Sequence, residues 1–260
     1  MYAARGSENN DLSEVYSYAN TFGISRSAVN AKIAEKPFLR SRLIAWKYLL
    51  HSLFNTGYTP WLKGDSTAYI DTGVIPNDGD GLEYSMYFHT SSRCHVGSRL
   101  DYQHRAGAFC LGFVENNLLA INAAYETVPT KYATNTPVTR DAKHTFQLRK
   151  IGNNAVCLID GVQAFSFSAE TLNSIYPIYI FTWNNNNVPD NRRIGQADPM
   201  TYARIDNSNG EARWHGVPYF DNGEYGMLDL VSGNFYGSAV PNGLFSYELW
   251  DSNNNVVNIN

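Results

Sequence analysis

The segment KHTFQLRKIGNNAVCLIDGVQAFSF, at residues 143–167, decides the fold class because it predicts three consecutive β-strands. The second and third strands are separated by Asp160-Gly161, a pair that favours a type I′ hairpin turn with positive φ at both central residues. Apolar and polar residues alternate, so one face is expected to enter a core and the other to meet water. The side chains expected to face the core are Phe146, Leu148, Val156, Leu158, Phe165 and Phe167.

The composition is also typical of a β-rich chain. Aromatic residues make up 14% of the 260 residues and charged residues 17%, and aromatic side chains suit the half-buried surface of a pleated sheet. The 20 glycines provide for many turns. A net charge of −4 gives the molecule no overall field that attracts nucleic acid.

The cysteines and the N-terminal residues bear on where the protein is made. Cys94, Cys110 and Cys157 form no disulfide framework, so reduced, buried thiols and assembly inside a cell are expected. The first residues, MYAARGSENND, lack the apolar stretch of a signal peptide. No apolar run approaches the roughly 20 residues of a membrane-spanning helix, so no membrane contact is expected.

Residues 12–54 have a helical period. We expect a short helix over residues 12–19, a second helix from its N-cap Ser25 to Glu35, and a long helix over residues 38–54. The long helix carries an a/d stripe that predicts an oligomerisation or partner-binding seam, although a small module docked on the β domain or on a neighbouring subunit would show the same pattern. The stripe consists of Leu39, Leu43, Trp46, Leu50 and Leu53.

The segment FGISRSAV, at residues 22–29, suggests an alternative function for this helical region. It has the Gly-containing turn and the following short helix of a helix-turn-helix, and Arg26 and Lys32 are among the basic residues that would meet phosphates. The match is short, and the acidic remainder of the chain gives no support. DNA binding through residues 22–35 is therefore the lesser alternative, and nucleic acid is not an expected partner.

From Thr67 onward the sequence predicts many short β-strands and no helix of normal length. Segments of alternating polarity are separated by Gly, Asn, Asp and Pro, which is typical of a sandwich or barrel. About a dozen strands in one domain suit a jelly roll better than an immunoglobulin-sized sandwich. The boundary with the helical region is expected at residues 57–64, where Gly, Pro and Thr occur together.

Several short sequence segments of the β region are informative when they are taken in chain order. They are AYIDTGV at residues 68–74 with Pro76-Asn77, the central hairpin followed by PIYIF at residues 177–181 and by Asn184, YARI at residues 202–205 leading to Val217-Pro218, YGMLD at residues 225–229 and SGNFYG at residues 232–237.

Together these segments resemble the laminin-G/concanavalin A-like jelly-roll domains of tailed-phage virion proteins and of gut Bacteroidetes surface proteins, over about residues 66–247. The resemblance implies a mainly β protein with a concanavalin A-like jelly-roll β-sandwich at residues 65–250. A small α-helical N-terminal segment at residues 1–57 and a C-terminal tail at residues 251–260 would flank it.

The resemblance also implies a function. The chain would be a non-enzymatic phage virion component, such as a head or tail fibre or a decoration protein, with a lectin-like domain for attachment to host or mucosal glycans. It would be made in the host cytoplasm. Its partners would be other virion proteins or a second copy, bound through the N-terminal helices, together with glycans.

Glucanases of the same broad superfamily use two carboxylates in an E-x-D-x-x-E arrangement. Alternate residues on one strand face bring an acid and a nucleophile close together. Glu83 lacks such a partner, since position 85 is Ser85, and Asp229 stands among apolar residues. No catalytic residue is predicted, and an enzyme with an unrecognised site is the alternative.

A metal site is not predicted either. Asp78 and Asp80 look like the start of a calcium loop, but the Glu that would close the loop is missing, and a plain turn is expected. His89, His95 and His144 meet no metal-ligand spacing. No cofactor is expected.

The most suggestive surface is Trp183 followed by the Asn run at residues 184–187. Sugar sites combine an aromatic ring with amides that bind hydroxyl groups. A second loop with aromatic and polar residues lies at residues 101–105. The alternative is that Trp183 is a core residue and the Asn run a plain loop. The predicted carbohydrate-binding residues are Trp183, Asn184, Asn185, Tyr102 and His104.

Overall fold

The computed structural model describes residues 12–40, 46–89, 94–99, 108–113, 121–125, 138–169, 171–172, 174–190 and 198–257. The chain divides into two compact units. One comprises Met1–Pro60 with Leu249–Asn260, and the other comprises Trp61–Glu248. No described helix is long and apolar enough to cross a bilayer.

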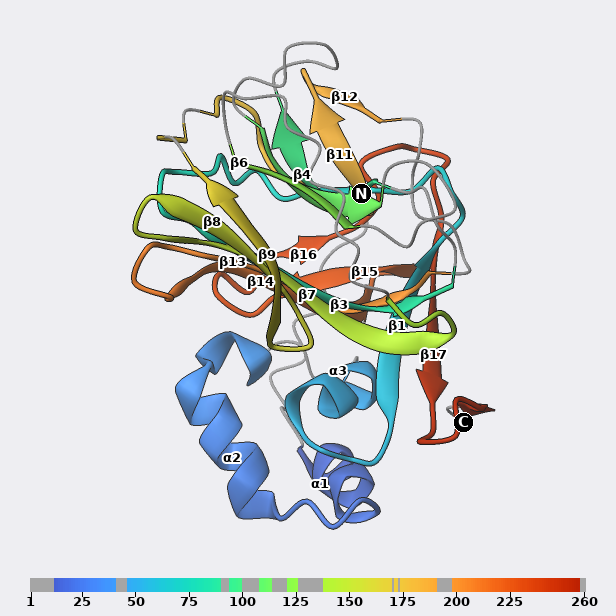
Figure 1. The fold of residues 1–260 in the computed structure, drawn as a ribbon. Helices are drawn as coiled ribbons and strands as arrows, with labels where there is room; N and C mark the ends of the chain where they lie inside the picture. The colour runs from blue at the N-terminus through green and yellow to red at the C-terminus, as the bar shows by residue number, and fades with distance from the viewer. Residues whose placement is uncertain are drawn as a thin grey trace. The chain divides into compact units, whose positions relative to one another are not determined.

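The first unit contains the helices α1 (Ser13–Asn20), α2 (Arg26–Glu35) and α3 (Trp46–Leu53) (Figure 1). The first two agree with the prediction: Gly23 turns the chain with φ +72°, and the Ser25 hydroxyl caps α2 by accepting the Ala28 N–H at 3.2 Å. The predicted long third helix is wrong at its start, because residues 37–40 form a 3₁₀ turn.

Aromatic side chains around His51 join the helices of the first unit. His51 meets Tyr18, Phe22 and Tyr58 edge-on, with ring centroids 6.0, 5.0 and 5.8 Å away. Its ring nitrogens lie 3.1 Å from the Tyr18 hydroxyl and 2.7 Å from the Thr56 hydroxyl. Burial lowers the pKa of His51 to about 4, so the imidazole is neutral at pH 7.

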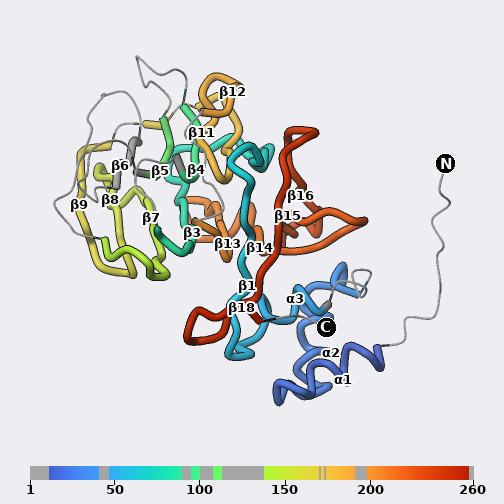
Figure 2. Tube along the Cα trace, turned by 90° about the vertical axis from the view of Figure 1, so that its right-hand side faces the viewer, coloured from blue at the N-terminus to red at the C-terminus, as the bar shows by residue number. Residues whose placement is uncertain are grey.

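The second unit is built on two β-sheets, although β18, the first two residues of β1 and the last two residues of β17 belong to the first unit. In sheet A the strand order is β16-β15-β14-β13-β3-β7-β8-β9, and β1, β17 and β18 extend it from β13. Figure 2 shows β1 and β17 running side by side. The strands of sheet A are β1 (Thr59–Gly64), β3 (Gly81–Phe88), β7 (Ala142–Ile151), β8 (Asn154–Ile159), β9 (Val162–Ser168), β13 (Met200–Asp206), β14 (Ala212–Asp221), β15 (Glu224–Asp229), β16 (Phe235–Tyr236), β17 (Phe245–Trp250) and β18 (Val256–Val257).

Sheet B is smaller and follows the order β12-β11-β4-β10-β2, with β5 and β6 added beside β4. Strands β4 and β11 run parallel. The two sheets enclose one hydrophobic core, so the predicted jelly-roll β-sandwich is confirmed (Figure 1). The strands of sheet B are β2 (Ile70–Asp71), β4 (Cys94–Arg99), β5 (Phe109–Phe113), β6 (Ile121–Tyr125), β10 (Tyr179–Ile180), β11 (Thr182–Asn185) and β12 (Val188–Pro189).

The central hairpin forms as the sequence predicts. Asp160 and Gly161 both have positive φ, at 52° and 78°, as a type I′ turn requires. The Asp160 carboxylate also accepts the Thr145 N–H at 2.8 Å and lies 2.6 Å from Nδ1 of His144. These contacts tie the turn to the preceding strand β7.

The predicted core face of β8 is wrong. Ala155, Cys157 and Ile159 belong to the core cluster. Val156, which is also buried, and Leu158 lie on the opposite side of the strand. The register explains the difference, because Cys157 pairs with core residue Leu148 on β7, and paired residues point the same way. Alternation could not show this, since Ala155–Ile159 is apolar throughout. On the other two strands, Phe146, Leu148 and Phe167 are in the core and Phe165 packs against it.

One polar pair lies inside the core. Tyr84 on β3 and His95 on β4 are fully buried, with the Tyr84 hydroxyl 2.7 Å from Nδ1 of His95. Burial lowers the pKa of His95 to about 3 and raises that of the Cys157 thiol to about 12. Cys110 and Cys157 are buried free thiols, as expected.

Several strands lie where the sequence predicted none. Strand β1 occupies the expected domain boundary, and its Pro60 and terminal Gly64 resemble a linker. Strand β18 lies in the expected C-terminal tail and pairs with β17. Two-residue strands such as β12 and β18 show no alternation, so pattern analysis cannot find them.

Candidate functional site

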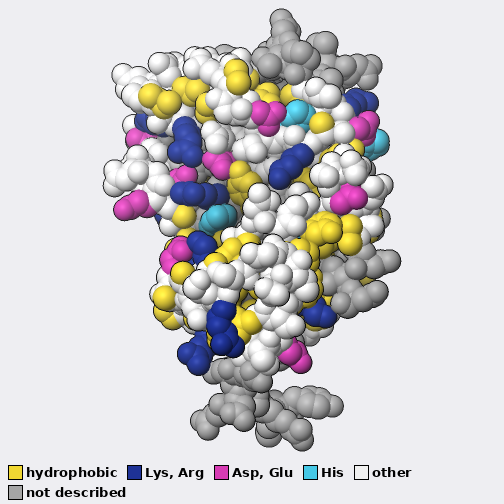
Figure 3. Space-filling view, turned by 90° about the horizontal axis from the view of Figure 1, so that it is seen from below, with side chains coloured by type: hydrophobic (Ala, Val, Ile, Leu, Met, Phe, Trp, Pro, Cys, Tyr) yellow, Lys and Arg dark blue, Asp and Glu magenta, His cyan; other side chains and the backbone are white. Residues whose placement is uncertain are grey.

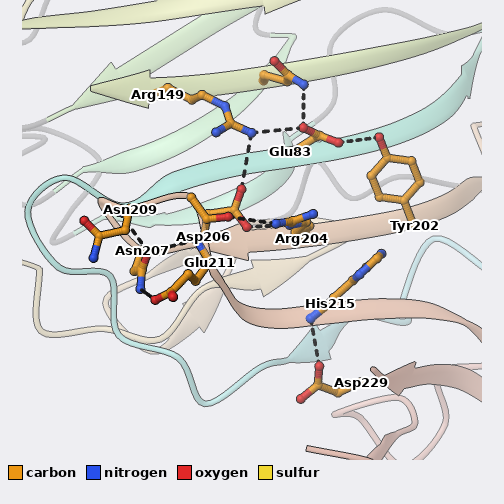
Figure 4. Close-up of polar contacts among 12 residues, drawn as sticks. Glu83, Arg149, Tyr202, Arg204, Asp206, Asn207, Asn209, Glu211, His215 and Asp229 are labelled. Carbon is orange, nitrogen blue, oxygen red and sulfur yellow. Dashed lines mark hydrogen bonds and ion pairs between the residues drawn. The ribbon is translucent and has the colours of Figure 1, made fainter. Parts of the chain in front are cut away.

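The outer face of sheet A carries a polar cluster. On β3, Leu82 and Tyr84 point into the core, so Glu83 between them points outward. Its cross-strand neighbours are Gln147 on β7 and Arg204 on β13. Figure 4 shows side chains from β3, β7 and β13 converging here. The Glu83 cluster consists of Glu83, Gln147, Arg149, Tyr202, Arg204 and Asp206.

Both oxygens of Glu83 are engaged. Tyr202 donates its hydroxyl proton to Oε1 at 2.7 Å, while Gln147 Nε2 and Arg149 Nη2 donate to Oε2 at 2.5 and 3.3 Å. Burial, and then the hydrogen bond and charge of Glu83, raise the pKa of Tyr202. The phenol therefore keeps its proton at pH 7 and continues to donate it to Glu83.

Both oxygens of Asp206 are engaged in the same way. Arg149 Nη2 also reaches Asp206 Oδ2 at 3.3 Å, and Arg204 Nε donates to Oδ1 at 2.5 Å. A second nitrogen of Arg204 donates to the Gly210 carbonyl at 3.0 Å. One guanidinium therefore bridges Glu83 and Asp206, and the cluster is a fixed hydrogen-bond network with no carboxylate oxygen lacking a protein donor.

Asp229 is a second buried carboxylate, and it organises a turn. Its Oδ1 accepts the N–H groups of His215 and Val231 at 2.8 and 3.0 Å. Its Oδ2 accepts the N–H and the hydroxyl of Ser232 at 3.1 and 2.6 Å. These bonds close the connection between β15 and β16, so Asp229 has a structural role.

The Asp78 and Asp80 side chains contact protein cations. Lys150 Nζ lies 2.8 and 3.0 Å from the two oxygens of Asp78. Arg213 pairs with Asp80, which also accepts the Asn77 N–H at 2.8 Å. Among the described residues, no group of three or more His, Cys, Asp or Glu side chains is placed to hold a metal ion.

The predicted sugar-binding role of Trp183 and Asn184 conflicts with their positions. Trp183 is 4% exposed, its Nε1–H is donated to the Leu111 carbonyl at 2.9 Å, and the Arg99 guanidinium lies over its ring at 5.0 Å. Asn184 is fully buried and donates to the Pro177 carbonyl at 2.8 Å. A buried indole cannot stack on a sugar in solution, so both residues support the sheet edge.

The remaining residues of the Asn run lie at the surface. Asn186 and Asn187 form the exposed turn between β11 and β12, with φ of 57° and 60°, and Asn185 is half-buried beside them. The Tyr176 hydroxyl donates to Asn186 Oδ1 at 2.5 Å. The predicted Tyr102 and His104 lie outside the described residues.

The described leucines of the predicted oligomerisation seam are largely buried within this chain. Leu39 and Leu50 are fully buried, and Leu53 is half-buried. Leu43 and the side chain of Trp46 lie outside the described residues. Buried leucines are not available to a second copy, so the seam prediction is wrong for Leu39 and Leu50.

The basic residues of the helix-turn-helix-like segment are engaged locally. The Arg26 guanidinium lies 4.3 Å from the ring centre of Tyr16, and Lys32 pairs with Glu35 at 2.8 Å. On the face drawn in Figure 3, the described Lys and Arg side chains are interspersed with Asp and Glu. Neither observation favours the concentrated basic stripe that nucleic-acid binding needs.

Sequence reasoning missed Tyr176 and most of the Glu83 cluster. Gln147 and Arg149 alternate with core residues, which places them on the outer face. Their partners Glu83 and Asp206 are brought to them only by the strand register. Tyr176 lies in an irregular segment, where no periodic signal exists.

Comparison with known proteins supports the fold. No known family profile matches the chain, and no curated protein matches it. A candidate carbohydrate-binding protein of Bacteroides ovatus has a similar structure, with a TM-score of 0.52 and 10% identity over 78% of this chain and 62% of the other. This likeness agrees with the jelly-roll fold.

More distant similarities were also found. The laminin α1 chain of mouse, in its domains LG4-5, matches with a TM-score of 0.43 and 13% identity over 58% of this chain and 42% of the other. The CBM40 of a Ruminococcus gnavus sialidase, bound to α2,3-sialyllactose, matches with a TM-score of 0.41 and 9% identity over 55% of this chain and 89% of the other.

Proposed function

We propose that the chain is a non-enzymatic phage virion component whose β-sandwich is a lectin-like domain for attachment to host or mucosal glycans. The observation that carries the proposal is a jelly-roll sandwich on whose outer face the carboxylates of Glu83 and Asp206 are engaged by protein donors. The similar Bacteroides ovatus protein is a candidate carbohydrate-binding protein, which supports glycans as the ligand class.

The contacts of Glu83 and Asp206 support binding rather than hydrolysis at this cluster. A glycosidase needs one carboxyl group that gives a proton and a second that attacks the sugar or activates water. Glu83 and Asp206 face each other across Arg149, and each oxygen already accepts a hydrogen bond. To contact a substrate, a carboxylate oxygen of Glu83 or Asp206 would have to give up one of these hydrogen bonds.

The virion placement rests on the segments at residues 68–74, 177–181, 225–229 and 232–237, which resemble jelly-roll domains of tailed-phage virion proteins and of gut Bacteroidetes surface proteins. The buried free thiols Cys110 and Cys157 suit a protein assembled in a reducing compartment. Within the particle, a head or tail fibre or a decoration protein is the role that we propose.

The helical unit is proposed to contact other virion proteins or a second copy. Because Leu39 and Leu50 are buried, the contact would use another surface. Helix α2 suits this role, since Val29 is its buried residue and most of its other side chains are exposed or half-buried.

Two measurements test the proposal. The full chain is applied to an array of neutral, sialylated and sulfated glycans, and purified phage particles are labelled with an antibody against the chain. Glycan binding above the level of an unrelated protein, with label on intact particles, is expected. Absence of binding to every glycan would refute the lectin role, and label restricted to lysate protein would refute the virion role.

A further inference from the structure

We infer that an edge of sheet B, the Asn rim, is a subsite for neutral sugars; this inference rests on the proposed glycan-binding function. The Asn rim is formed by the turn of the β11–β12 hairpin and the irregular segment next to it. It consists of Ile175, Tyr176, Asn185, Asn186, Asn187 and Val188.

Buried hydrogen bonds hold the Asn rim in place. Asn184 accepts the Asn187 N–H at 2.7 Å and donates to Pro177, which joins the hairpin turn to the neighbouring segment. The Asn186 N–H is donated to the Arg99 carbonyl at 3.1 Å. The turn is thus fixed from beneath, and a preorganised turn loses little conformational entropy when it binds a ligand.

The Asn rim also has an uncommitted amide. Asn185 Oδ1 is buried and accepts no hydrogen bond. An unsatisfied buried acceptor costs roughly 1–3 kcal/mol, and a ligand that donates a hydroxyl proton would remove this cost. Asn185 as a whole is half-buried, so a ligand reaches this buried oxygen when the amide turns outward.

Apolar groups flank these amides. Ile175 and Val188 are each 61% exposed, and the half-buried ring of Tyr176 is held by its bond to Asn186. Asn185 pairs directly with Val188 across the hairpin. Amides beside an apolar surface match a pyranose, which has hydroxyl groups at its edge and C–H groups on its face.

The chemistry of the Asn rim selects uncharged ligands. Residues 175–176 and 184–189 contain no Lys, Arg, His, Asp or Glu. The charged pair Arg99 and Asp190, of which Arg99 is the strand partner of Asn185, is buried and joined at 2.8 Å. A carboxylate or sulfate would lose its hydration without gaining an opposite charge, so neutral oligosaccharides are the expected class.

A turn substitution tests the inference with little effect on the fold. Asn186→Gly removes the amide but keeps a residue that tolerates positive φ. Asn222→Gly is the matched control, because Asn222 (φ 50°) is an exposed turn residue of the β14–β15 hairpin. Tyr176→Ala removes the ring and its hydroxyl.

The probe is an array of galactose-, mannose-, glucose- and fucose-terminated oligosaccharides with their sialylated and sulfated counterparts. We expect the wild type and Asn222→Gly to bind neutral glycans equally, and Asn186→Gly and Tyr176→Ala to bind them about tenfold more weakly. If the wild type binds but both rim variants bind equally well, the inference is wrong and the lectin function stands. Binding only to acidic glycans would refute the assignment of the Asn rim to neutral sugars. No binding by the wild type would refute the lectin function itself.

Discussion

The Glu83 cluster and the Asn rim are both polar surfaces of the sandwich, but their hydrogen bonds differ. In the Glu83 cluster each carboxylate oxygen accepts a bond from Tyr202, Gln147 or an arginine. In the Asn rim the oxygen of Asn185 accepts none, and two apolar side chains are largely exposed. A network in which every carboxylate oxygen accepts a hydrogen bond stabilises the sheet. The Asn rim is held in place by buried hydrogen bonds, and its free acceptor can accept a hydrogen bond from a ligand.

The largest expected effect comes from Trp183, which supports the rim from inside. Trp183→Ala should lower the free energy of unfolding by roughly 3–5 kcal/mol, because it removes a buried ring and leaves a cavity. Urea unfolding followed by circular dichroism measures the change. Trp183→Phe is the control, and its free energy of unfolding should fall less. Unchanged stability combined with lost glycan binding would instead place the indole in a sugar site.

Acid should destabilise both units, because His51 is buried in the first unit and His95 in the second. His95 and His51 have pKa values lowered to about 3 and about 4, so the unfolded chain takes up protons at a higher pH than the folded chain. Stability is therefore full above about pH 6.5 and falls as the pH drops towards these values, by on the order of several kcal/mol.

Thermal melts between about pH 7 and about pH 4.5 test this prediction above the range where ordinary carboxyl groups titrate. Replacing His95 with Gln should flatten the decline. A stability that stays constant over this range would show that neither imidazole is held neutral in the folded state.

Disrupting the Glu83 cluster should lower the free energy of unfolding less than removing the indole of Trp183. Glu83→Gln replaces a carboxylate that accepts from three side chains, and a loss of roughly 1–3 kcal/mol in unfolding free energy is expected. Tyr202→Phe, which removes one donor, should cost about 1 kcal/mol. Glycan binding should stay unchanged in both variants. A loss of binding without a loss of stability would move the ligand site to the Glu83 cluster.

The smallest effect is expected from salt. A neutral ligand on an uncharged rim has no ion pair to screen, so its affinity should change less than about twofold between about 50 mM and about 500 mM salt. Calorimetric titration at both concentrations measures this. A steep fall in affinity would indicate that charged groups bind the ligand.

Local signals explain what the sequence could predict. The Asp160-Gly161 turn and the Ser25 cap depend on neighbouring residues, and both form as expected. Which side chains of β8 point into the core depends on the register between β8 and β7. A continuous apolar run does not reveal that register. The sequence could not decide between a sugar-binding and a core Trp183, because its partners, Arg99 and the Leu111 carbonyl, come from distant strands. An Asn run gives no sign of which amide is buried.

The most direct test compares the two surfaces in one nuclear magnetic resonance titration of the full chain. The strongest neutral glycan from the array is added while the side-chain amide signals are followed. Signals of Asn185, Asn186 and Asn187 should shift in proportion to occupancy, and that of Gln147 should not move. Shifts at Gln147 with an unchanged Asn rim would contradict the account.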